Sequence, residues 1–195
     1  VINIITRKQV KDDLSVSVKL QEETAGSEYH PFGYKGVHLQ NLHIGYKKNY
    51  WTFSLGGTHN EFDGYGGDAY GRGKTWKPKE QWMGNYRVGY IKGPFNIYYR
   101  GDMLNEDIRS REAINYNNYK SIDQQYTTDR FSHQLQGGYN FNKKLQLAGI
   151  LSYTGYKRRT KTTRHDFKKD TDELTSGPGE QDLAKFNNFV FRTNL

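Results

Sequence analysis

Apolar and polar residues alternate one by one along much of this chain, and a period of two predicts β-strands rather than helices. In residues 14–21, with the sequence LSVSVKLQ, four aliphatic side chains alternate with four polar ones, so each kind gathers on its own face of a strand. No window keeps apolar residues at helical spacing over three turns. The two-faced pattern recurs at about residues 37–46, 51–59, 82–92, 95–103, 131–141, 145–154 and 186–194.

These eight segments are longer than ordinary strands. Most have about nine to eleven residues, whereas strands of five or six residues are usual. A strand tilted by about 45° needs roughly 9 to 11 residues to cross a bilayer. No apolar run approaches the roughly 20 residues of a membrane helix. The lengths therefore favour an all-β fold, a transmembrane antiparallel β-barrel.

Short and long connections alternate between the expected strands. The short ones are residues 47–49, 92–94 and 142–144, and the long ones are about 22–36, 60–81, 104–130 and 155–185. Outer-membrane barrels have short turns on the periplasmic side and long loops outside. We therefore expect one meander with every long loop on the same edge.

Aromatic residues make up 15% of the chain and gather at the ends of the expected strands. Rings at both ends would form the two interfacial girdles of a membrane barrel. One girdle would comprise Tyr46, Tyr50, Trp51, Tyr90, Phe95, Tyr139 and Phe141, and the other Trp82, Tyr99, Phe131, Tyr153, Tyr156 and Phe186. The alternative is a soluble sandwich whose rings form the core.

Composition excludes several classes of function. The chain has no cysteine, so disulfide frameworks, Cys-ligated metals and thiol catalysis are excluded. The six histidines show no metal-ligand spacing, and the sequence offers no catalytic arrangement. We therefore expect no enzyme, no metal site and no cofactor. The net charge of +8 favours an anionic partner, but acidic residues between 166 and 182 break the basic track that nucleic acid would need.

The first eight residues, VINIITRK, do not alternate. They resemble the VINIITK segment that closes the plug domain of TonB-dependent outer-membrane receptors, with Arg7 in place of the lysine. The resemblance covers less than a tenth of the chain. It implies a Gram-negative outer-membrane barrel of about 22 strands that is filled by a plug. It also implies uptake of a scarce ligand such as siderophore-iron, haem or cobalamin, with energy from the TonB system.

On this interpretation residues 1–8 are the C-terminal end of a plug domain, and residues 9–195 are the N-terminal part of a barrel domain with about eight of the 22 strands. We expect a piece of a longer protein, located in the cell outer membrane, whose contact with the TonB complex precedes Val1. Two alternatives stay open: a small eight-stranded outer-membrane barrel acting as an adhesin or structural anchor, and a soluble β module that binds polyanions.

Three groups of side chains are candidate functional residues. The long loops offer rings and a cation for ligand binding: Tyr65, Tyr70, Arg72, Trp76, Tyr116 and Tyr119. The polar faces of two strands would point Arg87, Tyr98, Arg100 and Asp102 into the lumen, with Arg87 opposite Arg100 and in need of acidic partners. At the outer rim, phosphates of lipopolysaccharide would meet Lys157, Arg158 and Arg159, while the barrel contacts outer-membrane lipid.

Overall fold

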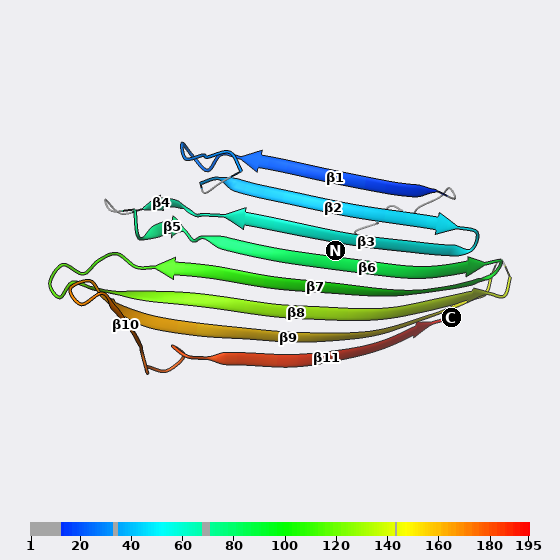
Figure 1. Ribbon diagram of the computed structural model, residues 1–195. Coiled ribbons are helices and arrows are strands. Elements are labelled where there is room, and N and C mark those ends of the chain that lie inside the picture. Colours follow the sequence, from blue (N-terminus) through cyan, green and yellow to red (C-terminus); the bar gives the residue numbers. More distant parts are fainter. Residues whose placement is uncertain (1–12, 33–34, 68–70, 143) are drawn as a thin grey trace.

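The computed structural model describes residues 13–32, 35–67, 71–142 and 144–195 (Figure 1). This part of the chain is all-β and contains no helix. Its strands are β1 (Leu14–Glu23), β2 (Val37–Lys48), β3 (Trp51–Phe62), β4 (Tyr65–Gly67), β5 (Lys74–Trp76), β6 (Lys79–Lys92), β7 (Phe95–Arg111), β8 (Lys120–Asn140), β9 (Gln146–Asp166), β10 (Thr171–Leu174) and β11 (Leu183–Asn194). The plug segment proposed for residues 1–8 lies outside the described residues.

The long strands form one antiparallel meander. The order in the sheet is β1-β2-β3-β6-β7-β8-β9, and β11 pairs with β9 over residues 148–159. The short strand β10 pairs with the far end of β9, and β4 and β5 form a separate hairpin. The predicted succession of eight long strands is therefore confirmed, and two short pairings are added to it.

The connections alternate in length as predicted. Two-residue turns at 49–50 and 93–94 and the turn 141–145 join strands on one edge, on the right in Figure 1. Asn49 (φ 54°) and Gly93 (φ 56°) adopt the left-handed conformation that tight hairpins use. Residues 24–36, 63–78, 112–119 and 167–182 make the connections on the opposite edge. All long connections thus lie together.

Three strands extend further than predicted. Residues 104–130 and 155–185 were expected to be loops, but β7 continues to Arg111, β8 starts at Lys120 and β9 runs to Asp166. These extensions carry polar side chains on both faces, which hides the two-faced signal. Bonds between strands stabilise them, as where Asn105 donates to Asp129 Oδ1 at 2.7 Å.

The sheet is a single open layer. The described residues contain no buried apolar core, and their buried polar side chains include His38, Thr128 and Thr162. The two packed layers of a soluble sandwich are therefore not what these residues form. Strands β1 and β11 lie at opposite edges and do not pair, so the described residues also do not close into an eight-stranded barrel (Figure 1).

Candidate functional site

The register collects large apolar side chains on one face of the sheet, towards the short turns. We call this belt the apolar band, and most of its members are exposed. The band consists of Leu14, Val16, Val18, Leu42, Ile44, Tyr46, Trp51, Phe53, Leu55, Tyr86, Val88, Tyr90, Phe95, Ile97, Tyr99, Met103, Phe131, Leu135, Tyr139, Leu147, Leu151, Tyr153, Phe189 and Phe191. Along β7 it runs from Phe95 to Met103, which is roughly 26 Å at about 3.3 Å per residue.

The apolar band is larger than the apolar patches of ordinary soluble surfaces. Eight strands spaced by about 4.8 Å make it roughly 34 Å wide, so its plan area is roughly 900 Å². The largest apolar patch of a soluble monomer is usually about 300 to 600 Å². A surface of this size and height needs a cover of lipid or protein.

Aromatic rings line the short-turn edge of the apolar band as predicted. The ring centroids of Trp51 and Tyr90 are 4.9 Å apart, and Tyr50 meets Tyr90 at 6.0 Å. Further along the same edge, Tyr139 and Phe141 are also 4.9 Å apart. These contacts make a ring-lined edge that crosses the sheet.

The opposite edge of the apolar band follows the prediction only in part. Trp82 stacks on His59 with centroids 4.0 Å apart, and Phe131 meets Tyr153 at 5.7 Å. Tyr156 and Phe186 also stack, at 5.1 Å, but they lie on the other face of the sheet, so their assignment to this girdle was wrong. For Tyr156 the reason is that β9 keeps its alternation through this residue, where a loop had been expected; Phe186 of β11 is its cross-strand partner and shares its face.

The predicted lumen residues share the face opposite the apolar band, which we call the polar face. Arg87 and Arg100 are directly opposite in the register, as predicted. Arg100 donates to Asp102 from Nε (2.7 Å) and Nη2 (2.8 Å), and Cζ of Arg87 lies 4.1 Å from the centroid of the Tyr98 ring. Neighbours within the sheet therefore offset the like-charge repulsion.

The polar face is basic along its whole extent. On the eight long strands it carries ten Lys or Arg residues and only four Asp or Glu residues. The cations are Lys19, Lys47, Lys79, Arg87, Arg100, Lys120, Arg130, Arg158, Arg164 and Arg192; the anions are Glu23, Asp102, Glu106 and Asp166. A face of this composition attracts anionic ligands.

Two of the predicted ligand-binding residues instead fasten the long connections together. The ring of Tyr65 lies against Gly26 of the first connection. In the same β4–β5 hairpin, Nζ of Lys74 is 3.9 Å from Oε2 of Glu28. Arg72 donates to Asp123 Oδ2 at 2.5 Å and to Ser121 at 2.8 Å, so it ties the β4–β5 hairpin to the start of β8. Sequence reasoning missed these partners because they lie up to 51 residues away.

Three predicted rings stay accessible at the long-connection edge. Trp76 is 65% exposed, Tyr116 is 53% and Tyr119 is 43%. The structure brings Tyr116 and Tyr119 together at 6.4 Å, edge to face, and places Nζ of Lys168 at 4.5 Å from the Tyr119 ring. The sixth candidate, Tyr70, lies outside the described residues. The exposed rings are suited to stacking on a flat or conjugated ligand.

The three predicted lipopolysaccharide contacts divide between the two faces. They lie within β9 and not in a loop, so the alternation of the strand separates them. Lys157 and Arg159 share the face of the apolar band, just beyond its long-connection edge. Arg158 points to the polar face, where its Cζ is 4.9 Å from the Tyr126 ring. The prediction that Arg158 shares a lipopolysaccharide contact with Lys157 is therefore wrong, because the two side chains lie on opposite faces of the sheet.

Sequence reasoning missed a buried histidine beneath the first long connection. His38 is 1% exposed, and its Nδ1 lies 2.6 Å from Oε2 of Glu22. The same oxygen accepts from the hydroxyl of Tyr29 and from the backbone N–H of Phe32, both at 3.3 Å. This cluster fixes Tyr29 and Phe32 of the first connection to the ends of β1 and β2. Only the cross-strand pairing of Glu22 with His38 could have revealed it.

Asp166 ends β9 far from the apolar band and stabilises the turn that follows. Its carboxylate accepts from the backbone N–H groups of Lys168 (3.0 Å) and Lys169 (3.2 Å) and lies 3.3 Å from Nζ of Lys120. Burial raises the pKa of this carboxyl group, but the hydrogen bonds and the Lys120 charge outweigh burial. The pKa of Asp166 therefore lies below its ordinary value.

We expect the turn after β9 to loosen in acid. Because the pKa of Asp166 is lower in the folded than in the unfolded chain, its stabilisation is complete above the unfolded value of about 3.9 and is lost as the pH falls through the folded value. Amide exchange at Lys168 and Lys169, corrected for intrinsic rates, should show this loss. In the variant Asp166→Asn, exchange at these two amides should not accelerate further as the pH falls. An acceleration as large as in the unmodified protein would contradict the assignment of this effect to Asp166.

Within the described residues, no group of three or more His, Asp or Glu side chains could hold a metal ion. None of the described segments is a helix that is long and apolar enough to cross a membrane. Comparison with protein-family models, curated proteins and solved structures gave no match. The sheet and its two faces are therefore the features of the described residues that bear on function.

Proposed function

We propose that this chain is part of an outer-membrane uptake receptor of the TonB-dependent type. The observation that carries the proposal is the apolar band: a continuous exposed belt, roughly 26 Å along the strands, on an antiparallel meander without an apolar core. Transmembrane barrels have an outward apolar band about 25 Å tall with aromatic rings at its edges. Lipid is thus the natural cover for this face.

The two edges of the sheet support an orientation in which the long connections face outwards from the cell. Short turns lie on one edge and long connections on the other, as in barrels with periplasmic turns and outer loops. In this proposal the polar face lines the lumen, because a closed sheet with lipid outside has its polar side inside. The open edges of β1 and β11 then continue into the remaining strands of a larger barrel.

Ligand capture is assigned to the accessible rings at the long-connection edge. Trp76, Tyr116 and Tyr119 would contact a scarce ligand such as siderophore-iron, haem or cobalamin, while Tyr65 and Arg72 hold the connections in place. The excess of cations on the polar face would draw an anionic ligand inwards. Import would then need movement of a plug and energy from the TonB system, as the resemblance of residues 1–8 implies.

A growth experiment tests the proposal. A deletion strain should lose growth when one of these three ligands is the sole source of iron or cobalamin, and the full-length protein should restore it from the outer-membrane fraction. Replacing Trp76, Tyr116 and Tyr119 together by alanine should raise the required ligand concentration at least about tenfold, since aromatic contact residues often dominate binding. Tyr50→Ala, at the short-turn edge, is the control. Normal growth of the deletion strain on all three ligands would contradict the proposal.

A further inference from the structure

Two lysines face each other just beyond the apolar band. Lys157 of β9 and Lys185 of β11 are direct partners in the register, so their Cβ atoms are about 4.5 to 5.5 Å apart on the same face. Like charges in this position repel each other and destabilise the sheet unless an anion lies between them. Sequence reasoning missed this pair because Lys185 had been placed at the end of a loop.

The two lysines belong to a larger basic cluster whose side chains form no ion pair within the described part of the chain. Arg159 and Lys161 continue along β9 on the same face. None of these four side chains forms an ion pair with a described carboxylate, whereas Arg100, Arg109 and Lys120 each do. Asp129 lies across the strand from Lys157 but forms no ion pair with it; its Oδ1 accepts a hydrogen bond from Asn105 at 2.7 Å. The cluster thus has unused capacity to bind an anion.

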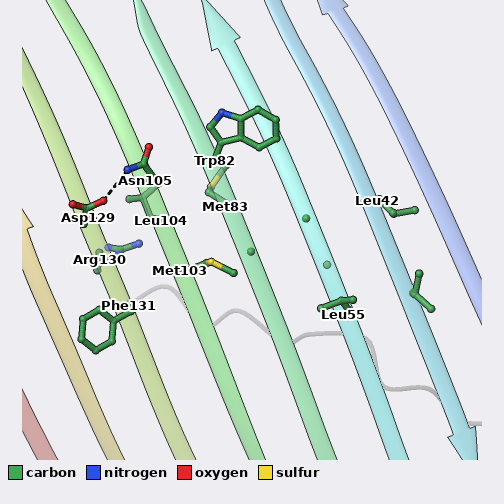
Figure 2. A pocket seen from close by; sticks show the side chains of 14 residues that line it. Leu42, Leu55, Trp82, Met83, Met103, Leu104, Asn105, Asp129, Arg130 and Phe131 are labelled. Carbon is green, nitrogen blue, oxygen red and sulfur yellow. Dashed lines mark hydrogen bonds between the residues drawn. The ribbon is translucent and has the colours of Figure 1, made fainter.

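A groove crosses the apolar band and ends on β8, the strand next to the cluster residues of β9 (Figure 2). Its volume is about 600 Å³, and Leu42, Leu55, Trp82, Met103 and Phe131 line it. It starts near Asp129, which neighbours Lys157 in the register, and descends across the strands to Leu55 and Leu42 in the apolar band. One end is therefore on the strand next to the cations, and the other end lies among exposed apolar side chains of the band.

Glycines make the groove. Gly57 and Gly84 are direct partners in the register, so β3 and β6 present no side chain at this point of the face. Met103 partly covers Gly84, with its nearest atom 2.7 Å from an ideal Cβ position. Above Gly57 there is open space to at least 4 Å. The hollow in the apolar band is thus a gap of side-chain size, suited to a slender apolar group such as an acyl chain.

We infer that this surface binds a phosphorylated, acylated glycolipid of the lipid A type. Its phosphate would lie between Lys157 and Lys185, and one acyl chain would occupy the groove over Gly57. Charge complementarity selects this occupant: the cations are next to an apolar groove, so the ligand must be anionic at one end and hydrocarbon at the other. The inference rests on the proposed outer-membrane location, because this glycolipid forms the outer leaflet there.

Native mass spectrometry of the full-length protein in detergent tests the inference, with bisphosphorylated lipid A as the probe. Replacing both lysines, Lys157→Gln with Lys185→Gln, should weaken retention of the lipid at least about tenfold, because two charge-assisted contacts are lost. Removing the phosphates from the lipid should have the same effect on the unmodified protein. The matched control is Lys48→Gln, at the short-turn end of the same face, which should leave retention unchanged.

A second pair of variants tests the groove independently of charge. Gly57→Leu should place an apolar side chain in the hollow, where a Cβ atom meets nothing within 4 Å, and weaken retention several-fold. Gly149→Leu, also in open space on the same face, should leave retention unchanged. Equal retention of phosphatidylglycerol would overturn the glycolipid assignment, and unchanged retention in the double lysine variant would overturn the site. The ligand-dependent growth assay is a separate readout. If the full-length protein restores growth but the double lysine variant retains lipid A as well as the unmodified protein does, only the lipid site is contradicted. If the protein binds lipid A at this site but growth does not depend on it, only the uptake function is contradicted.

Discussion

Replacing Leu151 by arginine is expected to lower the free energy of unfolding in a bilayer by about 2–4 kcal/mol, the cost of an arginine near the midplane of a membrane barrel. Leu151 lies in the middle of the apolar band, between Leu135 of β8 and Phe191 of β11. In the proposed orientation its side chain faces hydrocarbon, where a guanidinium loses its hydration. Urea titration of the protein refolded in phospholipid vesicles measures the change.

The neighbouring residue supplies the control for this prediction. Ser152 occupies the next position of β9 and points to the polar face, beside Gln134 and Val190. Ser152→Arg should change the free energy of unfolding by less than about 1 kcal/mol, because the new cation stays hydrated. Equal losses for the two variants would show that the two faces have the same surroundings, which the proposed membrane location does not allow.

Replacing Gly64 by alanine is expected to disrupt the β4–β5 hairpin at a cost of about 2–4 kcal/mol, from backbone strain together with a clash. Gly64 has φ 84°, and a Cβ there would lie 2.5 Å from the backbone oxygen of Trp76 and 2.9 Å from the ring of Pro78. Neither neighbour is a flexible side-chain end, so the hairpin base must shift. Amide exchange at Tyr65 and Lys74 should become faster, and ligand-dependent growth should weaken because Trp76 moves.

The variant at Gly71 separates the cost of backbone strain from the cost of the clash. It also has positive φ, 67°, in the same hairpin, but nothing lies within 4 Å of its Cβ position. Gly71→Ala should therefore cost only the strain of the left-handed conformation, about 1–2 kcal/mol. If both variants exchange equally fast, the close approach of Gly64 to Trp76 has no energetic role.

The period-two pattern predicted the amphipathic parts of the sheet, because there burial and exposure differ between the faces. It gave the eight long strands, the side of the long connections and the opposition of Arg87 and Arg100. It did not predict the ends of β7, β8 and β9. Both faces are polar there, so residues such as Asn105 and Asp129 give no alternation, and it is pairing between strands that keeps them extended.

The candidate site was predictable only where it depended on local spacing. Exposure of Trp76, Tyr116 and Tyr119 agrees with their expected place in long connections. The partners of Arg72 and the pairing of Lys157 with Lys185 depend on contacts between distant segments. Spacing alone cannot supply such contacts, because each requires the register of several strands. The plug end at residues 1–8 stays a prediction.

The unequal lengths of the strands give the sheet an uneven rim. Gly57 of β3 and Gly155 of β9 lie in one row of cross-strand partners. Beyond this row, towards the long connections, β3 has five more residues and β9 has eleven. At about 3.3 Å per residue, β9 therefore extends about 20 Å further than β3. In a barrel of the proposed orientation, β9 lies on the tall side of the rim, whereas the shorter β3 and β6 are extended only by the β4–β5 hairpin, which Arg72 ties to the start of β8. A large molecule arriving from outside would therefore meet a paired strand on one side and a separate hairpin on the other, so its approach to the interior would differ with direction.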